Sequence, residues 1–146
     1  MTMSESNYAQ PDLNLVGEAH IQAYRESGGE VGYVWNGVPT LLLTVTGRRT
    51  GRELTSALIF GRDGDDYLVV ASKGGWPRHP SWYLNLQANA AATIQVKAEH
   101  IAVRARTASE AEKPRLWKIM TGVWPNYDVY QARTDRDIPV VVLSPA

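Results

Sequence analysis

The stretch TLLLTVTGRRTGRELTSALIFGRDGDDYLVVAS, residues 40–72, decides the fold of this chain. It contains three runs rich in leucine and β-branched residues, over 40–46, 54–60 and 67–72, and such runs predict strands. The two connections between them carry glycine and charged residues, with several aspartates in the second, and these favour tight turns. The stretch therefore predicts a meander of three strands.

Helices are predicted on both sides of this meander. Residues 12–27 place apolar side chains at helical spacing, with Asp12 as the N-cap and Gly28-Gly29 as the stop signal. After the meander, Pro80 suits a first helical position and predicts a short helix over 80–90.

The rest of the chain completes an α+β pattern. Strands are predicted over 93–97 and 101–106, and Ser109 to Glu112 has the spacing of a capping box that opens another helix. Pro114 predicts an irregular first turn in that helix, because proline removes a backbone donor. The apolar run 138–143 predicts a closing strand buried on both faces. Short strands with modest connections favour a mostly antiparallel barrel, with helices inserted between strands, over a doubly wound sheet.

Length and composition limit the function classes. The chain of 146 residues fits one domain, which we expect over residues 12–146 after a flexible tail at 1–11. Its 15 basic and 15 acidic residues give zero net charge, so no nucleic-acid partner is expected. Cysteine is absent and the three histidines lack metal-ligand spacing, so neither thiol chemistry nor a metal is expected.

The location predicted from the sequence is the cytoplasm. The N-terminal residues lack the apolar stretch of a signal peptide, and no apolar run approaches the ~20 residues of a membrane helix. Peripheral membrane contact through the N-terminal helix stays open, as does the oligomeric state.

The first connection of the meander gathers positive charge. Arg48, Arg49 and Arg52 lie close to Gly47 and Gly51, which allow backbone N–H groups to converge on an anion. Composition alone favours an exposed hairpin tip over an anion site, since charged turns commonly protect sheet edges.

A second basic connection changes this balance. Residues 72–80, SKGGWPRHP, leave a strand and enter a helix, whose N-terminus attracts anions. If both connections lie at one end of the barrel, Lys73 and Arg78 join the three arginines around one cleft. We interpret His79 as a surface or helix-start residue and not as a catalytic base.

Aromatic residues recur near the C-terminus. Trp124, Tyr127 and Tyr130 are spaced by three, which on a helix forms one stripe. Structural packing is the ordinary explanation, yet the flanking polar residues and proline favour a segment that covers a pocket.

Three stretches together resemble the deazaflavin-dependent nitroreductase family, whose members are reductases that use coenzyme F420. They are LLLTVTGRRTG (41–51), GRDGDDYLVVASKGGWPRHPSWYLNLQANAAATIQV (61–96) and WPNYDVYQARTDRDIPVVVL (124–143). The resemblance implies a split β-barrel and hydride transfer from reduced F420 to a small electron-poor acceptor. Quinones, unsaturated lactones of the aflatoxin and coumarin type, and nitro compounds are the acceptor classes it implies.

The resemblance also implies roles for individual residues. Cofactor-binding residues would be Arg48, Arg49, Thr50, Gly51, Arg52, Ser72, Lys73, Gly74 and Trp82. Tyr127, Tyr130 and Ser72 would serve catalysis, and Trp124 would join the two tyrosines at the substrate. The chain has Leu54 where well-known members have a tail-binding arginine, and Trp124 where they have a tyrosine, which leaves the tail contacts and the acceptor open.

Two other functions stay open from the sequence. The same barrel architecture binds FMN elsewhere, and one FMN phosphate would also suit a basic turn. A carrier that binds the deazaflavin without catalysis is the third hypothesis.

Overall fold

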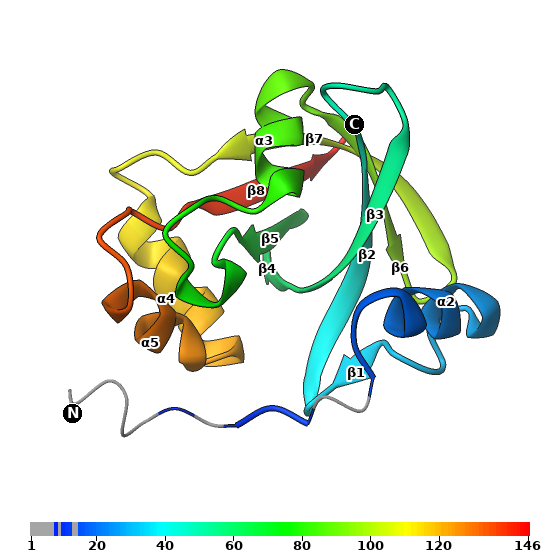
Figure 1. The fold of residues 1–146 in the computed structure, drawn as a ribbon, viewed down its shortest axis with the longest axis horizontal. Coiled ribbons are helices and arrows are strands. Elements are labelled where there is room, and N and C mark those ends of the chain that lie inside the picture. Colours follow the sequence, from blue (N-terminus) through cyan, green and yellow to red (C-terminus); the bar gives the residue numbers. More distant parts are fainter. Residues whose placement is uncertain (1–7, 9, 13–14) are drawn as a thin grey trace.

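The computed structural model describes residues 8, 10–12 and 15–146, which form a half-open, mostly antiparallel β-barrel with helices around it (Figure 1). Its strands are β1 (Val34–Trp35), β2 (Val38–Thr46), β3 (Glu53–Ile59), β4 (Gly61–Asp63), β5 (Asp66–Val70), β6 (Ala91–Val96), β7 (Glu99–Thr107) and β8 (Val140–Pro145). Its helical segments are α2 (Gly17–Ser27), the short 3-10 turn η1 (Lys73–Gly75), α3 (Ser81–Ala88), α4 (Lys113–Val123) and α5 (Asn126–Ala132).

The sheet runs in the order β1-β2-β6-β7-β8-β5-β4, and β3 pairs with β2 outside this path. Every strand pair recorded among the described residues is antiparallel. Only Phe60 separates β3 from β4, so the chain itself connects the two ends of the sheet. The predicted α+β class and the predicted antiparallel barrel are confirmed.

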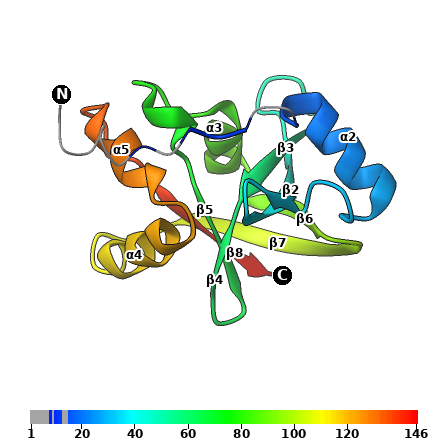
Figure 2. The same cartoon turned by 90° about the horizontal axis from the view of Figure 1, so that it is seen from below.

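Strands β2, β5 and β8 bury side chains on both faces, which explains their nearly unbroken apolar sequences. In β8, Val141 and Leu143 point into the barrel core, whereas Val140 and Val142 pack under α4 and α5. The same alternation in β2 places Leu42 beneath α2. Figure 2 shows α2 on one side of the barrel and the α4–α5 pair on the other, with α3 between them.

The start of the first helix differs from its prediction. Helix α2 begins at Gly17, and Asp12 is not its N-cap. Asp12 instead donates its backbone N–H to the Asn36 side chain at 2.6 Å and accepts a bond from that side chain at 3.1 Å, so it contacts the turn between β1 and β2. Residues 13–14 of the predicted helix and most of the predicted tail lie outside the described residues. The end at Gly28 is confirmed by its left-handed φ of 62°.

The start of α4 also differs from its prediction. The capping box forms, since Ser109 N–H donates to Glu112 Oε1 at 2.9 Å and Glu112 N–H donates to Ser109 Oγ at 3.3 Å. However, it closes a turn ahead of the helix, and α4 begins at Lys113. Pro114 therefore stands in the first turn of α4, where no backbone donor is lost, and the irregular first turn predicted after Ser109 is present as the non-helical turn over 110–112.

Candidate functional site

One loop, residues 72–80, separates two cavities and helps to line both. Ser72, Gly74 and Pro80 face the first cavity, and Pro77, Arg78 and His79 face the second. Lys73 lines both cavities. We call the first the aromatic cavity and the second the cationic cavity.

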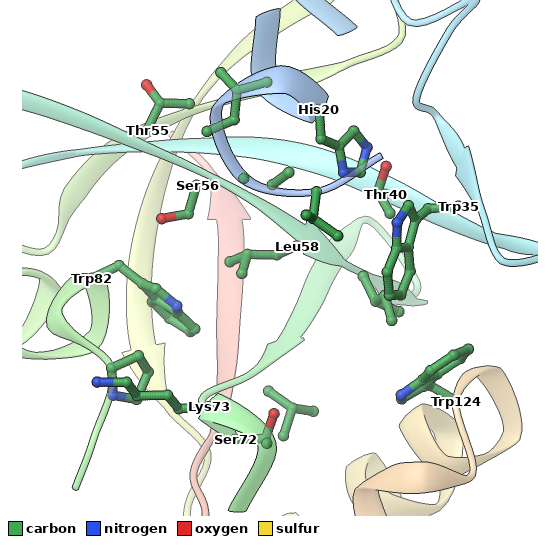
Figure 3. Close-up of a pocket in the computed structure, with 18 of the residues that line it drawn as sticks. His20, Trp35, Thr40, Thr55, Ser56, Leu58, Ser72, Lys73, Trp82 and Trp124 are labelled. Atoms are coloured by element: carbon green, nitrogen blue, oxygen red, sulfur yellow. The ribbon is translucent and has the colours of Figure 1, made fainter. Parts of the chain in front are cut away.

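The aromatic cavity has a volume of about 550 Å³ and lies between α2, β3, α5 and the 72–80 loop. Figure 3 shows Trp82 and Lys73 toward one end and Trp35 with Trp124 toward the other. The Trp35 and Trp124 rings lie 5.7 Å apart and inclined at 47°, so they form one continuous wall. A flat, largely apolar ring system suits such a cavity.

The cationic cavity has a volume of about 500 Å³, and its lining includes no carboxylate. Arg48, Lys73, Arg78 and Arg136 line it. The ion pairs found among the described residues are Arg106–Glu112, Lys113–Asp137 and Arg115–Asp63, so they involve none of these four cations. This cavity can therefore receive a polyanion, whose charges would replace the missing carboxylates.

Arg48 is held in place by helix α3. Its backbone N–H and its Nη1 donate to Asn85 Oδ1 at 3.0 and 2.8 Å, and Asn85 is buried. Because Asn85 is neutral, it orients the guanidinium without neutralising the charge.

The remainder of the basic turn does not reach the cavity wall. Arg49, Thr50, Gly51 and Arg52 are exposed, and none lines either cavity. Bonds from Gly47 N–H to Arg52 O at 2.7 Å and from Gly51 N–H to Gly47 O at 2.9 Å close the turn. The expected group of five cations is thus brought together only in part: Arg48, Lys73 and Arg78 meet, and Arg136 takes a place that the sequence does not indicate.

The 72–80 loop has an unusual backbone around the predicted cofactor-binding residues. Lys73, Gly74 and Gly75 have φ values of 45°, 62° and 84°, so three consecutive residues occupy the left-handed region. Gly75 has no room for a side chain, since a Cβ there would lie 2.6 Å from Tyr130 O. The loop is therefore seated directly on α5. Ser72 and Trp82 are buried beside it and line the aromatic cavity.

The aromatic stripe reaches the cavity from two elements. Trp124 follows the last residue of α4, and Tyr127 and Tyr130 lie in α5; all three line the aromatic cavity. The Trp124 Nε1 donates to Tyr130 Oη at 3.3 Å. Burial raises the pKa of both tyrosines, most strongly that of Tyr127. Both phenols therefore stay protonated at neutral pH and can donate a hydrogen bond.

His79 is a neutral histidine beside a cation. Burial, and then the charge of Arg136, lowers its pKa. Arg136 Nη1 lies 3.2 Å from His79 Nδ1, and since a guanidinium only donates, Nδ1 is the acceptor. Neutral His79 then carries its proton on Nε2.

Sequence reasoning missed two residues of the site. His20 lies in α2, lines the aromatic cavity and donates through Nε2 to Gly32 O at 2.7 Å. Arg136 lies in a charged run of the sequence that is typical of a solvated loop, and its partners are 57–65 positions away in the chain. The helical spacing of His20 was a usable signal, whereas Arg136 offered none.

The residues that the structure describes contain no cluster of three or more His, Asp or Glu side chains placed to hold a metal ion. None of the helices they form is both long and apolar enough to cross a bilayer.

Comparisons with known proteins agree on one family. The sequence model of the family described as F420H(2)-dependent quinone reductase matches residues 17–145. An F420H(2)-dependent quinone reductase of Mycobacterium tuberculosis is 44% identical over 129 residues, covering 86% of this chain and 87% of that protein. A solved F420-H2 dependent reductase aligns with a TM-score of 0.68 at 36% identity, over 73% of this chain and 94% of that one. A chain described as a domain-swapped dimer gives the same TM-score of 0.68 and 36% identity, over 73% of this chain and 80% of that one.

Proposed function

This chain belongs to the F420H(2)-dependent quinone reductase family, and from that premise we propose that it reduces a planar, electron-poor acceptor, with quinones as the first class to test. It is an oxidoreductase, and its cofactor is reduced coenzyme F420. When bound, that cofactor supplies a hydride. The chain's own residues bind the cofactor, orient the acceptor and donate a proton to it.

The residues of the two cavities fit a cofactor with one anionic part and one flat ring. Arg48, Lys73 and Arg78 would hold the anionic part in the cationic cavity, where no carboxylate competes. Ser72, Gly74 and Trp82 would contact the ring in the adjoining aromatic cavity. The single observation that carries the proposal is that Lys73 lines both cavities.

The acceptor would occupy the end of the aromatic cavity formed by Trp124, Tyr127 and Tyr130. When a hydride reaches a quinone, negative charge develops on an oxygen, and a hydrogen-bond donor next to that oxygen stabilises the transition state. Tyr127, which is buried, and Tyr130, which is half-buried, are suited to this because their raised pKa values keep their protons in place. Unsaturated lactones and nitro compounds develop similar oxygen charge and belong to the same proposal.

The basic turn supports a long polyanion over a single phosphate. Arg48 lines the cavity, while Arg49 and Arg52 extend positive charge outside it along an exposed turn. An extended row of cations suits an acidic tail, whereas one FMN phosphate needs only the cavity.

The test follows oxidation of reduced F420 by a quinone, a coumarin-type lactone and a nitroaromatic compound. We expect turnover with at least the quinone, and we expect Tyr130→Phe to lower turnover at saturating cofactor about two- to ten-fold, the worth of one neutral hydrogen bond. The affinity of Tyr130→Phe for F420 should stay within about two-fold of wild type. Stoichiometric binding without turnover on any acceptor would favour the carrier, and tight binding of FMN but not F420 would reject the proposed cofactor site.

A further inference from the structure

Arg136 makes four polar contacts to the 72–80 loop and the residue just before it. Its Nε donates to Trp76 O at 2.7 Å, and its Nη2 donates to Ser72 O at 2.7 Å. Its Nη1 donates to Ala71 O at 3.1 Å and lies 3.2 Å from His79 Nδ1. A guanidinium carries five N–H donors in a rigid fork, and this loop presents acceptors to most of that fork.

These contacts bracket the left-handed part of the loop. Ser72 and Trp76 flank Lys73, Gly74 and Gly75, whose φ values are all positive. A left-handed lysine is costly and persists only where its surroundings over-determine it. The internal bonds, Gly75 N–H to Ser72 O at 2.9 Å and Trp76 N–H to Lys73 O at 3.1 Å, do not reach beyond the turn itself. Arg136 adds side-chain hydrogen bonds that join the two ends of the turn to the segment after α5.

Arg136 is itself fixed by α5. Its carbonyl accepts a bond from Gln131 Nε2 at 2.8 Å, and its N–H donates to Thr134 Oγ1 at 3.3 Å. Gln131 belongs to α5, the helix that carries Tyr127 and Tyr130. The 72–80 loop and the helix that faces the acceptor are therefore connected through one side chain.

We propose that Arg136 is a positioning residue. It holds the 72–80 loop in the conformation that receives the anionic part of the cofactor, and it fixes the position of that loop relative to α5. This inference rests on the proposed function for its ligand, but the clamp itself is a property of the free protein. Two effects are combined in Arg136, namely the forked hydrogen bonds and the positive charge on the cavity wall.

Two variants separate these effects. Arg136→Lys keeps the charge but places all its donors on one nitrogen, so it cannot bond carbonyls on both sides of the turn. Arg136→Met removes both the charge and the donors. Arg62→Lys is the matched control, because Arg62 also bonds the carbonyls of a turn, Gly64, Asp65 and Asp66, away from either cavity.

The first measurement is amide hydrogen exchange of Gly75 and Trp76 in the cofactor-free protein. We expect exchange at least about ten-fold faster in Arg136→Lys, with no change at these amides in Arg62→Lys. The second is the F420 dissociation constant from fluorescence titration, which we expect to rise about ten-fold or more in Arg136→Lys.

Unchanged exchange and an F420 dissociation constant within about two-fold of wild type in Arg136→Lys would overturn the clamp. If only Arg136→Met weakened binding, the charge alone would be responsible and the positioning role would be wrong. Thermal unfolding of each variant identifies a loss of fold. Should Arg136→Met not fold, the hydrogen exchange and F420 affinity of Arg136→Lys alone test the proposal. Failure of the wild type to bind F420 would contradict the proposed function, while hydrogen exchange would still decide the clamp.

Discussion

Two neighbouring arginines of the basic turn have different surroundings and should differ in effect. Both side chains are exposed, but Arg48 is oriented by Asn85 and lines the cationic cavity, whereas Arg49 lines neither cavity. We expect Arg48→Ala to raise the F420 dissociation constant about ten- to hundred-fold, as for a charge-assisted contact. Arg49→Ala should raise it less than about three-fold, because a charge outside the cavity is screened more strongly by solvent and salt than one on the cavity wall.

Titration at low and at physiological ionic strength checks this difference. The contribution of Arg49 should fade as salt rises, while that of Arg48 should persist. Equal effects of the two substitutions would show that the turn binds as an undivided patch of charge.

His79 should make stability depend on pH. Its folded-state pKa lies below the ordinary value of 6.5, so near that pH the unfolded chain binds more protons than the folded one. Its contribution is thus fully present above pH 6.5 and is lost as the pH falls from there toward the folded-state pKa. Urea unfolding from pH 8 to pH 5 should show stability falling more steeply in wild type than in His79→Gln. Parallel curves would contradict the assignment of a neutral His79.

At the scale of elements, the contact between the 72–80 loop and α5 leaves no space for a methyl group. Gly75→Ala places a Cβ 2.6 Å from Tyr130 O in a residue whose φ is 84°. We expect the free energy of unfolding to fall by about 1–3 kcal/mol from the backbone strain alone, with the steric clash adding to it, and F420 affinity to fall with it.

Gly64→Ala separates the two causes. Gly64 has a φ of 60°, yet an added Cβ would meet no atom within 4 Å. This variant should show the conformational cost without the clash and without loss of F420 affinity. Chemical denaturation of Gly75→Ala and Gly64→Ala provides the comparison. An equal loss of stability in the two variants would mean that α5 moves away from the added methyl group without a further cost.

The sequence predicts an element correctly when the interactions that determine it involve residues close by in the chain. The strands over 40–46 and 67–72 follow from side-chain alternation and turn residues, and the structure has them as β2 and β5. The N-terminal start of α2 was missed because Asp12 bonds Asn36, a partner 24 positions away. Arg136 was missed for the same reason, since its acceptors lie in another connection. The predicted roles of Ser72, Lys73 and the tyrosines concern ligand contacts and stay predictions.

At the scale of the whole molecule, β8 unites the two main cores. Leu143 is fully buried in the barrel core, while Val140 and Val142 belong to the core under α4 and α5. Leu143→Ala should lower the free energy of unfolding by about 2–5 kcal/mol, since the barrel cannot collapse around the cavity. Leu54→Ala, at a side chain that is 47% exposed, should change it by no more than about 0.5 kcal/mol. Urea denaturation measures both changes. A small loss of unfolding free energy for Leu143→Ala would show that neighbouring side chains move into the space left by Leu143.

The position of β8 in the sheet also affects how the protein is made. This strand lies between β7 and β5, yet it follows every other element that the described residues form. While the ribosome is still synthesising the helical segment before it, β5 and β7 each have an edge without a partner, and such edges invite pairing with other nascent chains. The barrel can thus be completed only after β8 has been synthesised. Aggregation during overexpression should therefore respond to elongation speed over the codons for residues 108–139 more than to those of the meander.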